Sequence, residues 1–172
     1  MLKYGVAAAL LLSVPMFGPG LVFGLRPDWM KVGEIVGYTA MLLCMSATWL
    51  AMRDAQAQGG GTLRFGALLA IGVGVAAVAA VVFGVLSGLA MTAWGDAGVD
   101  ALLQYYGQQV RETGASGEAL ARRLAELEAM RPMLSNRPLQ GAIMGATVFV
   151  IGVAESLVGA AWLARRARLA AA

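Results

Sequence analysis

The sequence contains no histidine, one cysteine and few charged residues. Without histidine, the chain lacks the commonest general base and a common haem and zinc ligand. Because Cys44 stands alone, the chain can form neither an intramolecular disulfide nor a cysteine metal cluster. No candidate base stands near a candidate nucleophile. We therefore expect a protein that is not an enzyme and that binds no cofactor or metal.

Charged residues make up only 13% of the chain, whereas hydrophobic residues make up 59%. A typical soluble domain carries roughly 25% charged residues, and a chain of 172 residues cannot bury so large an apolar excess. The composition excludes a soluble globular fold and predicts a multi-pass protein of a lipid bilayer. The net charge of +3 does not indicate nucleic acid, because no basic run is longer than Arg165-Arg166.

Four apolar segments are long enough to cross a bilayer, which takes about 20 residues. They run from about residue 4 to 25, 32 to 52, 65 to 94 and 138 to 164. The first contains Pro15 and lacks a cleavage site of small residues, so we interpret it as an uncleaved, kinked helix. The third is longer than the bilayer core and is expected to tilt or to emerge from the membrane.

The polar segment 95–137 also has a helical pattern. Apolar residues recur at helical spacing at Val99, Leu103, Tyr106 and Val110, and again at Leu120, Leu124, Leu127 and Leu134. Gly114 to Gly117 separate the two stretches. We predict an all-α fold, one membrane domain over residues 1–172, in which the extended third span and a second helix form a hairpin outside the bilayer.

The distribution of Lys and Arg predicts the orientation in the membrane. With a cytoplasmic N-terminus, the inner side carries Lys3, Arg53, Arg64, Arg165, Arg166 and Arg168, and the short outer loop carries only Arg26 and Lys31. Cytoplasmic loops are enriched in such residues, and long loops count little. We therefore expect both termini in the cytoplasm and the hairpin on the opposite side.

Part of the second and third spans resembles a known family. The residues that carry the resemblance are Gly37-Tyr38, Met41, Arg53-Asp54, Gly60-Gly61, Phe65 and Gly72. They resemble a family of small bacterial membrane proteins catalogued as domain of unknown function 4199. Its members have about four spans, a short glycine-bearing loop before the third and a polar amphipathic segment before the last. The resemblance covers most of the chain and implies a bacterial inner-membrane protein, but it supplies no activity and no catalytic residue.

Two acidic residues lie within predicted spans. Glu155 stands in an otherwise apolar stretch, where a carboxylate costs roughly 2.5–3.5 kcal/mol on insertion scales. It is either a proton or cation site, or a buried structural carboxylate, neutral or paired, that fixes the helix register. Arg165 and Arg166 are close enough in sequence to approach it. Glu34 lies close to the outer boundary, and we favour an interfacial charge paired with Lys31 or Arg26.

A charge cluster and a set of glycines complete the candidates. Arg53, Asp54, Arg64, Arg165 and Arg166 form a cytoplasmic cluster that either docks a partner or lipid phosphate, or anchors helix ends. Gly84/Gly88 and Gly141/Gly145 have the spacing of close helix contacts. We favour packing within one bundle over a homo-oligomer interface for these glycines.

Two functions remain open. The first is a non-enzymatic membrane subunit that self-associates or packs into a larger membrane complex. The alternative is a small transporter or lipid-handling protein that uses Glu155. The first is favoured because polar groups within the spans are few and no internal repeat is visible.

Overall fold

The computed structural model describes residues 1–25, 27–61, 63–114 and 116–170, and contains helices and no strand among them. The all-α prediction is confirmed. The helices are α1 (Leu2–Phe23), α2 (Pro27–Met45), α3 (Ala47–Gln58), α4 (Phe65–Glu112), α5 (Gly117–Ala129), α6 (Arg131–Ser135) and α7 (Arg137–Ala170). Arg26 and the side chain of Arg168, both used to predict the orientation, lie outside what the structure describes, as does Ala115 in the predicted turn.

Four helical segments are long and apolar enough to cross a membrane, as predicted. They are Leu2–Phe23, Met30–Gln58, Phe65–Glu112 and Arg137–Ala167. The second differs from the prediction because Ser46 divides it into α2 and α3. The hydroxyl of Ser46 donates to the carbonyl of Leu43 (2.6 Å), and that of Thr48 donates to the carbonyl of Met45 (2.8 Å). Such bonds to the preceding turn often bend a helix.

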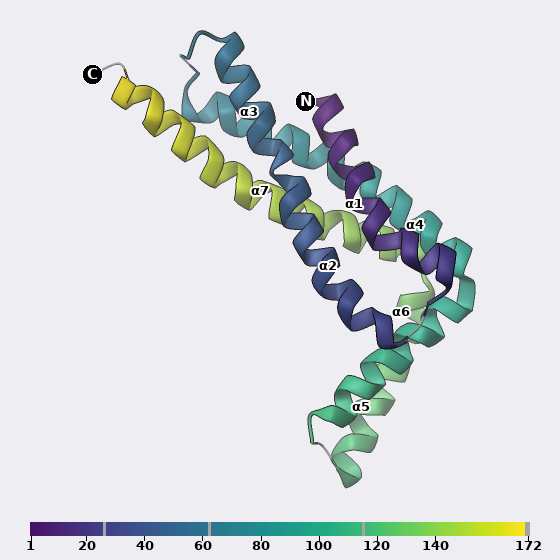
Figure 1. The fold of residues 1–172 in the computed structure, drawn as a ribbon. Coiled ribbons are helices and arrows are strands. Elements are labelled where there is room, and N and C mark those ends of the chain that lie inside the picture. The colour runs from purple at the N-terminus through teal and green to yellow at the C-terminus, as the bar shows by residue number, and fades with distance from the viewer. Residues whose placement is uncertain (26, 62, 115, 171–172) are drawn as a thin grey trace.

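The third span continues beyond the apolar segment into the hairpin. Within α4, Gly95 has φ 62° and ψ −147°, a conformation that favours glycine. After Gly95, α4 pairs with α5 and projects away from the bundle (Figure 1). Val99 and Leu103 of α4 form a small core with Leu134 of α6, and Leu127 of α5 packs against it. Tyr106, which the spacing placed on the same apolar stripe, is exposed.

The bundle places the hairpin and the chain ends at opposite poles (Figure 1). Both termini and the turn between α3 and α4 lie toward one pole, and the hairpin forms the other. We call the first of these the loop end. An even number of crossings accounts for both termini lying at the same end. The orientation relative to the cytoplasm is a separate question, to which we return below.

The centre of the bundle is the crossing of α4 and α7, where the backbones touch. A Cβ atom added to Gly84 would lie 2.8 Å from the carbonyl oxygen of Gly141. A Cβ on Gly141 would lie 2.6 Å from the carbonyl oxygen of Gly84, and one on Gly145 would lie 2.8 Å from that of Ala80. Gly88 is less tightly placed, with its nearest neighbour 3.6 Å away at the carbonyl of Arg137. The glycines chosen from the sequence therefore lie against one another within one chain.

Replacing Gly84 with alanine should separate α4 from α7, because the new methyl group meets backbone that cannot rotate away. We expect Gly84→Ala to lower the free energy of unfolding by about 1–3 kcal/mol, the usual range for overpacking. Thermal unfolding in mild detergent measures the effect. Gly88→Ala is the matched control on the same helix and should unfold close to the wild-type temperature. Equal melting temperatures for all three proteins would contradict the close backbone contact.

Candidate functional site

Glu34 joins the bundle to the base of the hairpin. Its carboxylate accepts a hydrogen bond of 2.7 Å from the hydroxyl of Tyr105, a buried residue on the hairpin part of α4. The predicted partners were Lys31 and Arg26. No ion pair to Lys31 is found among the described residues, and Arg26 lies outside them. The fold instead brings a tyrosine hydroxyl to Glu34 from far along the chain.

Two arginines make further polar contacts that hold the hairpin. Arg131 contacts Asp100 at 2.6 Å and Glu128 at 2.5 Å, and Arg137 contacts Asp96 at 3.1 Å. Glu128 and Asp100 raise the pKa of the Arg131 guanidinium above its ordinary range. Arg131 of α6 contacts Asp100, and Arg137 of α7 contacts Asp96, both on the hairpin part of α4. These two contacts fix the direction in which the hairpin leaves the bundle.

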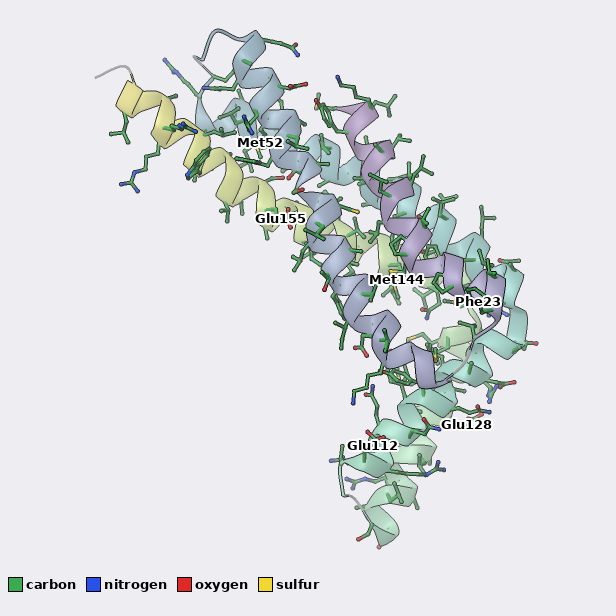
Figure 2. The ribbon with its side chains drawn as sticks, in the orientation of Figure 1. Phe23, Met52, Glu112, Glu128, Met144 and Glu155 are labelled. Carbon is green, nitrogen blue, oxygen red and sulfur yellow. The ribbon has the colours of Figure 1, made fainter. Side chains whose placement is uncertain are left out.

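Glu155 is half-buried on α7, where that helix passes α2 and α3 (Figure 2). Residues near Glu155 on α7 pack tightly against other helices. Gly152 lies close to the side chain of Met45, and the buried Ser156 lies close to Gly72. No hydrogen bond or ion pair reaches the Glu155 carboxylate from the described residues, so the expected approach of Arg165 or Arg166 does not occur in the structure. Glu34 and Glu155 are not brought together.

The neighbouring hydroxyl groups bond to backbone rather than to Glu155. Ser156 donates to the carbonyl of Gly152 (2.6 Å), and Thr48 donates to that of Met45 (2.8 Å). A chain of side-chain hydroxyls leading to the carboxylate is therefore not formed by these residues. Glu155 is a single acidic group beside the junction of two helices, and a proton or cation there would depend on that carboxylate alone.

The predicted charge cluster at the loop end separates into two parts. Asp54 accepts a hydrogen bond from the hydroxyl of Tyr4 and lies 4.0 Å from the ammonium of Lys3, so it faces α1. Arg53 instead lies over the ring of Trp49, with Cζ 5.0 Å from the ring centroid. Arg64 occupies the N-cap position of α4. The five cluster residues do not form one ion-pair network in the described chain.

Sequence reasoning missed the aromatic residues of this end. Arg166 lies over the ring of Trp162 at 5.2 Å, and the rings of Trp49 and Trp162 have centroids 5.7 Å apart. Each arginine follows its tryptophan by four residues, the spacing of neighbours on one helix face. That spacing was readable in the sequence. The contact between the two tryptophans, which joins α3 to α7, was not.

The arrangement defines a class of protein, and one comparison gives the family. A helical chain with four segments suited to crossing a membrane is a multi-pass membrane protein. The model of the family "Protein of unknown function (DUF4199)" matches residues 3–165, so the chain belongs to that family and the predicted resemblance is confirmed. Searches of the curated proteins and of the solved structures gave no match. In the described part of the chain, no three His, Cys, Asp or Glu residues are grouped so that they could hold a metal ion.

The hydrogen bond from Tyr105 to Glu34 should contribute to stability, because a carboxylate near the membrane boundary depends on its donor. We expect Tyr105→Phe to lower the free energy of unfolding by on the order of 1 kcal/mol, measured by thermal unfolding. Tyr106→Phe, on the neighbouring exposed residue, is the matched control. A double-mutant cycle with Glu34→Ala, which removes the acceptor, should show a coupling between residues 34 and 105. Additive effects of the two substitutions would contradict a direct interaction.

Proposed function

We propose that this protein is a non-enzymatic protein of the bacterial inner membrane that anchors and displays its helical hairpin to a partner, either a second copy or another membrane protein. The observation that carries this proposal is the hairpin itself. It extends from a spanning helix, and three polar contacts fix its base: Glu34 with Tyr105, Arg131 with Asp100, and Arg137 with Asp96.

The construction of the hairpin supports a role in binding. Its core is small, and no residue of α5 is fully buried. Most of its surface is therefore available to another molecule. Met130 and Met133, where α5 meets α6, have large exposed side chains. Methionine adapts its shape to irregular partners and is common at binding surfaces, so we place the contact with the partner at this turn.

The membrane face offers a second surface for association. An open, mainly apolar groove of about 750 Å³ runs beside the α4–α7 crossing. Its lining includes Ala77, Gly88, Ala142 and Ala146, with Val85 and Phe149 along it. Small residues allow a transmembrane helix to approach closely, and packing drives helix association in lipid. A helix of a second copy or of a partner fits this groove, in keeping with a subunit of a membrane complex.

We further propose that the hairpin lies on the outer side of the inner membrane and that both termini are cytoplasmic. The termini and the turn between α3 and α4 lie at the loop end (Figure 1), and the elements that meet there carry Lys3 in α1, Arg53 in α3, Arg64 just before α4, and Arg165 and Arg166 in α7. Their number favours the cytoplasmic side for that end, because cytoplasmic boundaries carry an excess of Lys and Arg.

One experiment tests both the orientation and the partner. In a Cys44→Ala background, Met133→Cys and the matched control Gln58→Cys are treated in intact spheroplasts with a membrane-impermeant probe that carries a thiol-reactive and a photoreactive group. We expect the probe to modify residue 133 alone and, on illumination, to give one discrete crosslinked product at that position. The mass of the product shows whether the partner is a second copy or another protein.

The outcomes separate the two claims. Modification of residue 58 without residue 133 would reverse the orientation. Modification of residue 133 without any crosslinked product would contradict a partner at the hairpin while leaving the orientation supported.

A second candidate function, transport or lipid handling, is favoured by one observation. The half-buried Glu155 lies beside the α2–α3 junction at Ser46, and no described residue partners its carboxylate. Charged residues within spanning segments are candidates for functional sites. If this function holds, native mass spectrometry of the purified protein should detect a bound small molecule or lipid that Glu155→Gln fails to retain. Glu118→Gln, on exposed α5, is the control for loss of one negative charge. Identical bound species in all three proteins would contradict this second function.

A further inference from the structure

The arginines at the two poles of the molecule have different partners. In and beside the hairpin, Arg122, Arg131 and Arg137 form ion pairs with carboxylates of the same chain. At the loop end, Arg53 and Arg166 form no ion pair with any described carboxylate, and each lies over a tryptophan ring instead. The charges of these two arginines are therefore not neutralised within the described chain.

The two stacked arginines belong to one continuous structure. Trp49 and Trp162 are in contact across α3 and α7, with centroids 5.7 Å apart and an interplanar angle of 60°. Arg53 covers the first ring and Arg166 covers the second. Gly159 allows this approach, because a Cβ there would lie 3.0 Å from Cδ1 of Trp49. We call these four side chains the Trp–Arg array.

Beneath the Trp–Arg array the protein is packed and apolar. Met52, labelled in Figure 2, is fully buried between α3 and α7 and belongs to a core cluster with Leu68, Ala160 and Leu163. Trp49 packs on this cluster, whereas Trp162 is 46% exposed. One side of the Trp–Arg array thus packs on this buried cluster, and the ring of Trp162 leaves the other side exposed.

Neither guanidinium is paired with a carboxylate of the described chain, so each can bind an anion. A guanidinium held over an indole ring by a cation–π contact keeps N–H groups for a second partner. These groups can donate two parallel hydrogen bonds to a phosphate. Asp54 follows Arg53 in the sequence but does not neutralise it. Its carboxylate instead contacts the ammonium of Lys3 and accepts a hydrogen bond from the hydroxyl of Tyr4, both on α1.

We propose that Trp49, Trp162, Arg53 and Arg166 form a binding site for the phosphate of an anionic phospholipid. Arg53 and Arg166 lie five and four residues before the ends of α3 and α7. Tryptophan is enriched at the level of the lipid headgroups. The apolar spanning segments next to the array can contact the acyl chains of such a lipid. The two arginines, which no described carboxylate neutralises, can bind its negative headgroup.

The test uses the purified full-length protein in mild detergent, titrated with phosphatidylglycerol or with zwitterionic phosphatidylcholine. Native mass spectrometry counts the lipid molecules bound. We expect selective binding of phosphatidylglycerol, which the double variant Arg53→Gln/Arg166→Gln weakens roughly fivefold for each arginine removed. The matched control, Arg122→Gln/Arg123→Gln on exposed α5, removes the same charge and should retain the wild-type affinity. Because all four arginines are exposed, both variants should keep the wild-type melting temperature.

A lysine double variant, Arg53→Lys/Arg166→Lys, separates this site from a general attraction to positive charge. It keeps both charges and loses the planar stacked group, so we expect weaker binding than in the wild type. Wild-type affinity in the lysine variant would contradict a site built on stacking. Equal retention of the two lipids, or equal weakening by the hairpin control, would also overturn the proposal. One more result would overturn the proposal. The variant Arg53→Gln/Arg166→Gln would bind lipid as the wild type does but would lose a co-purifying protein.

Discussion

Contact between the backbones of α4 and α7 is the constraint on which the rest of the structure depends. Around Gly84 and Gly141 no side chain separates the two helices. Within a bilayer, lipid tails are as apolar as the side chains, so helix association depends on close packing rather than on escape from water. The other spans then pack on this pair. For example, Phe17 of α1 stacks on Phe83 of α4, with centroids 5.4 Å apart.

The same contact determines where the hairpin begins. Because α4 and α7 are held together up to Gly88 and Arg137, their polar extensions leave the bundle side by side. Gly95 then bends α4, and directly after that bend the ion pair between Asp96 and Arg137 joins α4 to α7. The hairpin needs only a small core of its own, since the bundle and these polar contacts already restrict its base.

Local patterns in the sequence predicted the elements, whereas their contacts depended on the fold. Hydropathy was sufficient for four spans, and helical spacing for the hairpin, because both report on residues close in the chain. The bond between Tyr105 and Glu34 joins residues 71 positions apart, so no local pattern revealed it. The division at Ser46 was missed for another reason. A serine that bonds back to its own helix is compatible with either a bent or a continuous helix.

Arginines at the two poles of the molecule differ in how their charge is compensated, and the two proposals rest on this difference. At the hairpin, Arg131 and Arg137 are compensated by the chain's own carboxylates, so those charges add little attraction for a partner. Selectivity there must come from shape and from apolar groups such as Met133. At the loop end, Arg53 and Arg166 are supported by aromatic rings, which orient a guanidinium without neutralising it. An anion from outside the chain is the remaining means of compensation, and in a membrane the nearest abundant anion is a lipid phosphate. Under the two proposals, the loop end would hold the bilayer surface and the hairpin would contact a second protein.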